Sequence, residues 1–329
     1  MDNRIIPGLD IVKFFLSILI VDIHVQGYLA LPLPIQQYVV HPLEGLAVPT
    51  FFVISSFLFF RKVRDSEHSS WDKVIHFLKR ICILYIFWCI VWSPIIYIQK
   101  EYLHPVDAMT PLNILRDFFF GYMFDASWFL GALIVGVPII YMLSKIFRND
   151  LLVMILPVLI YLYLRFHESL PSELQSLYEW YNSFKNPNLS FPGSLMWIGL
   201  GFVLANKKVL VYLDGTKNKV AWSCLMFFLV LNMITVVPVV FFILSVISLF
   251  VAAYTLKLPE HPDLYRRLRI YSILFYVIHD CFKKIPKQLF GMENGVGLFI
   301  ITLAFCFIIS EFIIRMKNVK GWGWLKYAY

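Results

Sequence analysis

The chain has 329 residues, of which 60% are hydrophobic and only 15% are charged. A water-soluble protein of this size cannot bury so much apolar surface, so the composition excludes a soluble enzyme and predicts an all-helical protein that crosses a membrane many times. The formal net charge of +8 does not indicate a nucleic-acid-binding protein, because the basic residues cluster in short loops between apolar segments.

Apolar runs predict about ten transmembrane helices in a single domain, 1–329, with no soluble domain. In chain order, these helices are expected at 8–30, 44–60, 75–99, 128–147, 151–166, 190–206, 219–233, 235–256, 270–290 and 296–315. Two of them, at 151–166 and 219–233, are short and need tilt or local thinning of the bilayer. The stretch 219–256 has a second interpretation, one span followed by a re-entrant segment, which Pro238 permits.

The distribution of basic residues predicts the orientation. With both termini in the cytoplasm, the cytoplasmic segments and Lys13 together hold 22 of the 29 Lys and Arg residues. The outer loops, at 100–127 and 165–190, are longer and more acidic. One group of cations departs from this rule, at the outer end of the ninth helix, namely Lys283, Lys284 and Lys287. Either that helix ends early, or the outer cavity requires positive charge.

Lys13 and His24 lie eleven residues apart in the first predicted helix. Eleven residues turn a helix through about 1,100°, three turns and about 20°, so both side chains share one face with a rise of about 16 Å. Ionisable residues inside a span rarely face lipid. The pair therefore predicts a polar cavity with Lys13 near its inner mouth and His24 deeper. In the alternative interpretation, Lys13 reaches to the membrane surface and His24 only links helices by a hydrogen bond.

Five segments resemble, in order and spacing, the membrane-bound acyltransferase family 3. They are Gly8-Leu9-Asp10 with Lys13 and His24, the apolar segment 48–62, the basic start of the third helix at 77–85, the Trp-Phe-Leu segment at 127–133, and Ser272-x-x-x-Tyr276-x-x-His279. Two positions depart from the family pattern. Ser56 stands where a glycine is usual, and Phe77 replaces the first arginine of an Arg-x-x-Arg motif that keeps Arg80.

This resemblance implies an O-acyltransferase of the bacterial inner membrane. The donor would be cytoplasmic acyl-CoA, most simply acetyl-CoA used as a substrate, and the acceptor a hydroxyl of an envelope glycan, such as a polysaccharide, O-antigen or lipid-linked sugar. No bound cofactor, metal site or nucleic-acid partner is expected. His24 would act as general base or as acyl acceptor, since an imidazole suits proton transfer at neutral pH.

Further residues receive roles in this scheme. His279 and Tyr276 are a supporting or second catalytic pair, or else an interhelical hydrogen bond. Four cations at the cytoplasmic side are expected to hold the phosphates of the donor by charge, namely Lys13, Arg61, Lys79 and Arg80.

Three acidic side chains are expected to have structural roles. Asp10 should pair with Lys13 or Arg80, and Asp22 should point away from His24 although it is only two residues away. Glu311 should pair with Arg315, because the two are four residues apart on a helix.

Two other classes of protein compete with the enzyme. A transporter or flippase for a glycan or lipid would use the same cavity for passage without covalent chemistry, but the sequence lacks the inverted repeat and paired broken helices of many transporters. A membrane scaffold would explain the loops but not a buried Lys and His.

Overall fold

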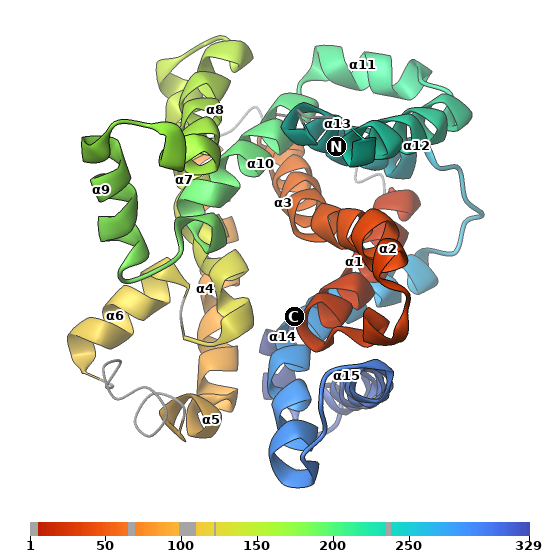
Figure 1. Cartoon of the computed structure of the whole chain (residues 1–329). Helices are drawn as coiled ribbons and strands as arrows, with labels where there is room; N and C mark the ends of the chain where they lie inside the picture. The colour runs from red at the N-terminus through yellow and green to blue at the C-terminus, as the bar shows by residue number, and fades with distance from the viewer. Residues whose placement is uncertain (1–5, 65–69, 99–109, 122, 235–237) are drawn as a thin grey trace. The chain divides into compact units, whose positions relative to one another are not determined.

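The computed structural model describes residues 6–64, 70–98, 110–121, 123–234 and 238–329 (Figure 1). Within these residues the chain is helical and contains no strand. It forms two compact units. The first unit comprises Met1–Ile54 together with Lys207–Tyr329, and the second comprises Ser55–Asn206.

The first unit is built around the first helix of the chain. Its helices are α1 (Pro7–Val25), α2 (Leu33–Ile35), the part of α3 (His41–Arg64) up to Ile54, α11 (Lys207–Gly215), α12 (Asn218–Ile234), α13 (Pro238–Thr255), α14 (Pro262–Phe290) and α15 (Val296–Met316). α1 packs against α13, α14 and α15, and α12 lies beside α13 (Figure 1). Because three helices surround α1, its polar side chains meet protein on several sides.

Local sequence signals set the ends of α1. Pro7 occupies the first turn, where a missing N–H costs nothing. Gly8 is required because any side chain there would collide with the carbonyl group of Ala253 on α13. The helix ends at Gln26, whose φ of 53° is left-handed, and Asp22 Oδ1 accepts a hydrogen bond from the Gly27 amide at 2.8 Å. The predicted span 8–30 is therefore five residues too long.

α3 begins earlier than the predicted range of 44–60. A π-helical turn at Gln36–Val40 joins α2 to α3, so one continuous apolar helix runs over Leu33–Arg64. Its 32 residues have a rise of about 48 Å, more than the hydrocarbon thickness of about 30 Å. The extra turns include Pro34, Pro42 and two glutamines, which is why a search for uninterrupted apolar sequence omits them.

Aromatic side chains fill the space between α1, α14 and α15. Phe14 of α1 contacts Tyr271 and Phe275 of α14, with ring centroids 6.1 and 5.7 Å apart. Phe307 of α15 packs edge-on against Phe275 at 4.7 Å. Such rings contribute large buried apolar areas and restrict how the helices can slide. This apolar layer separates the polar groups near one end of α1 from those near the other.

The second unit is a helical bundle in which α10 packs on α7 and α8, while α4 and α6 pack on α7. Its helices are the remainder of α3, α4 (Ser70–Val91), α5 (Ser93–Ile98), α6 (Pro111–Phe120), α7 (Trp128–Ile146), α8 (Asp150–Phe166), α9 (Ser172–Asn182) and α10 (Phe191–Leu204). Asp150 holds three helix ends together, since it accepts from Arg64 at 2.8 Å and from Asn206 at 2.6 Å.

α9 lies in the predicted outer loop at 165–190, where no helix was expected. It is anchored by Tyr181, whose hydroxyl lies 3.1 Å from Ser190 Oγ. Burial raises the pKa of this phenol to about 12, and the hydrogen bond with Ser190 partly opposes that rise. Tyr181 therefore stays protonated at neutral pH. The other predicted outer loop, at 100–127, also contains a helix that was not expected, α6, and its residues 100–109 and 122 lie outside the described residues.

Each of the ten predicted ranges coincides largely with a helix, apart from 99 and 235–237, which lie outside the described residues. Length and apolar composition qualify five of the described helices as membrane spans, or six if α10 and α11 form one broken span. α1 and α14 do not qualify, because both carry several ionisable residues. A polytopic helical protein is thus confirmed, whereas ten crossings and the side of the termini stay predictions.

Candidate functional site

Two polar contacts set the register of α1 against α14. Asp10 accepts hydrogen bonds from the guanidinium of Arg269, at 2.8 Å to Oδ1 and 2.6 Å to Oδ2. Fourteen residues further along each helix, His24 Nδ1 lies 3.4 Å from Lys283 Nζ. Equal steps on both helices, about 21 Å each, mean that α1 and α14 run parallel. α1 and α14 correspond to the first and ninth predicted spans. In a chain that crosses the membrane at every span, these two would also run parallel, because all odd-numbered spans point the same way.

His24 lies in a cluster of basic side chains at the far end of this pair. Its ring faces that of His279, with centroids 4.9 Å apart and planes inclined by 36°. Lys283 is 8% exposed and also contacts Asp280 Oδ1, at 2.8 Å. The site therefore contains two imidazoles, an ammonium and a carboxylate, contributed by α1 and α14.

The contacts of His279 and Asp280 on α14 indicate where the hydrogen of the His279 ring lies and how charge is distributed beside it. His279 Nδ1 lies 2.9 Å from the Phe275 carbonyl, which only accepts, so Nδ1 carries a hydrogen. Asp280 is fully buried and pairs with both Lys283 and Lys284, the latter at 3.2 Å. Two ammonium groups share one carboxylate, which leaves a net positive charge beside the imidazoles. A buried charge excess of this kind is costly and is typical of a functional site within a membrane protein.

Lys13 occupies the same face of α1 as His24, because α1 is continuous between them and the predicted register holds. Its ammonium lies 5.3 Å from the centroid of the Phe51 ring on α3, a cation–π contact. This contact directs the Lys13 side chain toward α3 within the first unit.

The other predicted donor-binding cations belong to the second unit. Lys79 and Arg80 are exposed on α4, and Arg61 is half-buried on α3. Within that unit, Lys73 donates a hydrogen bond to the Lys62 carbonyl at 2.7 Å and so ties α4 to the end of α3. That these three cations share a donor site with Lys13 stays a prediction.

Comparison with known families decides the identity of the chain. A model of acyltransferase family 3, described as an acyltransferase domain, matches residues 6–313. The chain belongs to this acyltransferase family. The match spans both compact units, so the acyltransferase domain includes α1 and α14 as well as the second unit. No match was found among the curated proteins or among the solved structures.

Asp10 of the acyltransferase pairs with neither predicted partner. The structure places its carboxylate, 2% exposed, against Arg269. The expectation of a pair with Lys13 or Arg80 was therefore wrong. Asp22, by contrast, points as expected, because it caps the end of α1 rather than facing His24. Tyr276 is buried, and its ring centroid lies 6.3 Å from that of His279, so its role as a partner stays a prediction.

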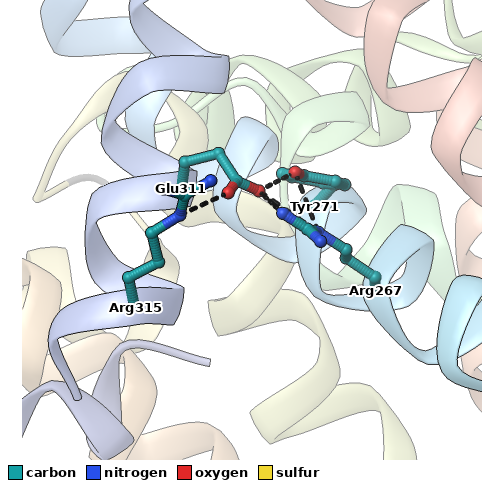
Figure 2. Close-up of polar contacts among 4 residues, drawn as sticks. All are labelled: Arg267, Tyr271, Glu311 and Arg315. Carbon is teal, nitrogen blue, oxygen red and sulfur yellow. Dashed lines mark hydrogen bonds and ion pairs between the residues drawn. The ribbon is translucent and has the colours of Figure 1, made fainter. Parts of the chain in front are cut away.

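The predicted pair of Glu311 and Arg315 is confirmed, at 3.1 Å, and it is part of a larger group (Figure 2). Glu311 on α15 also accepts from Arg267 and from the Tyr271 hydroxyl, both on α14. Figure 2 shows the carboxylate between these two helices. This group fastens α14 to α15 and contains neither of the two histidines.

Lys283 and Asp280 were not assigned to the site from the sequence, although one signal pointed to them. The lysine cluster at 283–287 contradicted the charge rule for loops. In the structure, α14 continues to Phe290 and turns Lys283 toward His24. The helix does not end early, and positive charge at this end of α14 adjoins the predicted catalytic histidine.

Proposed function

We propose that this acyltransferase moves an acyl group, most simply acetyl, from cytoplasmic acyl-CoA to a hydroxyl of an envelope glycan at the bacterial inner membrane. His24 is the residue that acts on the reacting groups. The observation that supports this role most directly is its contact with Lys283, in a buried cluster with His279 and Asp280. A histidine kept only for packing does not need a buried ammonium beside it.

The contact with Lys283 supports Nδ1 as the reactive atom of His24 in this proposal. An ammonium only donates, so Nδ1 holds the lone pair and Nε2 carries the hydrogen. At 3.4 Å this hydrogen bond is longer than usual, so an incoming substrate can replace Lys283 at Nδ1. The ammonium remains near the site through Asp280. Its charge would then stabilise the negative oxygen that develops when the thioester carbonyl is attacked.

Two balanced routes use this arrangement. In the first, Nδ1 takes the hydroxyl proton, the hydroxyl oxygen attacks the thioester carbon, the C–S bond breaks, and the departing thiolate receives the proton. In the second, Nδ1 attacks the thioester carbon, the C–S bond breaks, and CoA leaves as a thiol that has taken the hydrogen of Nε2. A glycan hydroxyl then attacks the acyl carbon, the bond from Nδ1 to that carbon breaks, and the hydroxyl proton returns to the imidazole. The second route carries the acyl group on the protein, and the first needs donor and acceptor together.

Lys13 is proposed to bind the acyl-CoA donor. It lies about 16 Å along the helix from His24 and on the same face. A cation at a helix end can hold the phosphates of CoA by charge. Arg61, Lys79 and Arg80 are proposed to add to this binding. On this face of α1, the end that carries Lys13 would thus bind the donor, and the end that carries His24 would act on the acceptor hydroxyl.

The test is transfer of labelled acetyl from acetyl-CoA to envelope glycan in membranes. His24→Ala should reduce labelling by about 10²–10⁴-fold at equal protein level, the usual loss on removing a general base. His76→Ala, which removes an exposed imidazole on α4, is the matched control and should keep full activity. Near-normal labelling with His24→Ala would overturn the assignment. Glycan that crosses the membrane without any acetyl-CoA-dependent labelling would instead favour a transporter or flippase.

A further inference from the structure

The end of α1 and the start of α3 bring together a second polar group, distinct from the histidine cluster. It comprises Asp22, Tyr28, His41 and Glu44. The rings of Tyr28 and His41 meet edge-to-face, with centroids 5.1 Å apart, and His41 Nδ1 lies 3.4 Å from Glu44 Oε2. Asp22 joins this group at the end of α1, where its Oδ1 atom accepts a hydrogen bond from the amide of Gly27, the residue before Tyr28, at 2.8 Å.

The burial of Glu44 has no evident structural purpose. Glu44 is 6% exposed, and its Oε1 atom is buried without a hydrogen-bond partner among the described residues. A buried carboxylate oxygen without a donor is strongly unfavourable, and more so in a chain that spans a membrane. His41, the basic group that contacts Glu44, is 49% exposed and makes only a long contact. The protein therefore retains a group that costs stability, as binding sites often do.

A second buried acceptor lies at the same end of α1. Asn294 donates to Gln26 Oε1 at 2.7 Å, while its own Oδ1 is buried without a partner among the described residues. Gln26 has the left-handed backbone conformation, which is uncommon for a residue with a side chain. Both unmatched atoms, Glu44 Oε1 and Asn294 Oδ1, are acceptors. A ligand that satisfies them must bring hydrogen-bond donors.

Hydroxyl groups fit this requirement better than a metal ion. The described residues contain no group of three His, Cys, Asp or Glu side chains close enough to hold a metal. A sugar presents several hydroxyl donors at once, and the exposed parts of the Tyr28 and His41 rings offer flat faces for its C–H groups. Asp22 and His24 are two residues apart on α1, so the helix turns about 200° between them and their side chains lie on opposite faces. A single sugar unit held at Asp22 therefore does not reach His24, and a longer glycan is needed to extend from this group to the imidazole.

We propose that Asp22, Tyr28, His41, Glu44 and Asn294 form a site that binds one sugar unit of the acceptor, while another unit of the same glycan presents its hydroxyl to His24. This inference rests on the proposed function, because it gives the acceptor a place. Glu44 and Asn294 receive hydrogen bonds from sugar hydroxyls, and Asp22 accepts another while it continues to cap α1. These residues determine which sugar is accepted, and they take no part in the bond changes.

The experiment uses the full chain in lipid nanodiscs and three probes: the methyl glycosides of glucose, galactose and N-acetylglucosamine. Saturation-transfer NMR reports binding without the donor. We expect transfer to at least one glycoside in the wild type and at least a tenfold weaker affinity in Glu44→Gln. Asp22→Asn, which keeps the cap, should weaken binding less. Glu293→Gln removes an exposed carboxylate after α14 and is the matched control, with unchanged binding.

Thermal unfolding separates this proposal from a structural role. Glu44→Gln relieves a buried charge, so the midpoint should stay the same or rise while binding is lost. A lower midpoint with unchanged glycoside affinity would show that Glu44 is structural, and would overturn the site. Absence of transfer to all three glycosides in the wild type would also overturn it.

Acetyl-CoA-dependent labelling of glycan, measured on the same variants, tests the proposed function separately. Glycoside binding without any labelling would refute the acyl transfer and leave the sugar site standing. Labelling whose rate is the same in Glu44→Gln as in the wild type would refute the sugar site and leave the acyl transfer standing.

Discussion

His24 differs from an ordinary buried histidine in the charge of its neighbours. Lys283 Nζ lies 3.4 Å from its ring, and Lys283 shares a single carboxylate with Lys284. A protein that needed His24 only to link two helices would be more stable with a neutral partner. The positive charge around His24 therefore favours a catalytic over a structural role for this residue. This interpretation can be tested by removing the charge without removing His24.

Lys283→Met should lower the rate of acyl transfer by about 10²-fold, because it removes the positive charge that is proposed to stabilise the negative oxygen of the transition state while His24 stays in place. Lys287→Met, further along α14, is the matched control and should leave the rate unchanged. The measurement is the initial rate of glycan labelling at equal protein level. An unchanged rate in Lys283→Met would show that the charge of Lys283 takes no part in the reaction.

Lys13 is expected to act on the donor by charge. Lys13→Ala should raise the KM for acetyl-CoA about tenfold and change kcat little, whereas Lys13→Arg should keep most of the activity. The measurement is the initial rate of glycan labelling over a range of acetyl-CoA concentrations. A fall in kcat at constant KM would place Lys13 in transition-state stabilisation instead.

At the scale of helices, the parallel pair of α1 and α14 brings together the side chains of the candidate site. Asp10 and Arg269 hold one end of this pair, and their separation of 259 positions in the sequence shows that the contact is purely tertiary. Because Asp10 is buried whereas Arg269 is 43% exposed, breaking the pair should cost about 1–3 kcal/mol, between the values for surface and buried pairs.

Asp10→Asn and Arg269→Gln should each lower the midpoint of thermal unfolding, and the double variant should lose less than the sum of the two. Acyl transfer should fall as well, because the register that places Lys283 beside His24 depends on this end of the helices. Strictly additive losses in the double-mutant cycle would show that the two side chains do not interact.

The positions of the helices could be predicted from the sequence better than their ends or the side-chain contacts between them. Apolar runs located ten helices because hydrophobic residues are needed wherever a helix faces lipid or core. The end of α1 at Gln26 and the early start of α3 were missed, since capping geometry and a π-helical turn carry little apolar signal. The partner of Asp10 could not be found locally. His24 was assigned to the candidate site because its own helix also carries Lys13 in register, whereas Lys283 was not assigned because its contact with His24 joins two different helices.

At the scale of the whole chain, the mechanism depends on which end of α1 faces the cytoplasm. α15 runs opposite to α1, since the Gly295 amide donates to the Val25 carbonyl at 2.9 Å. Pro7 and Met316 therefore lie at one end of the first unit. The distribution of basic residues predicts that this end is cytoplasmic. Donor phosphates can reach Lys13 only if that prediction is correct.

Single cysteines test the orientation in a chain whose five native cysteines have been replaced. Ser176 on α9 and His261 before α14 are both exposed, so a thiol at either position is accessible to reagent from its own side. Ser176→Cys should react with an impermeant maleimide in intact spheroplasts, and His261→Cys only after lysis. Reaction of His261→Cys in sealed spheroplasts would place Lys13 on the outer side, away from CoA. In that case the sugar site near Glu44 would face the cytoplasm, so both substrate assignments would have to be abandoned together.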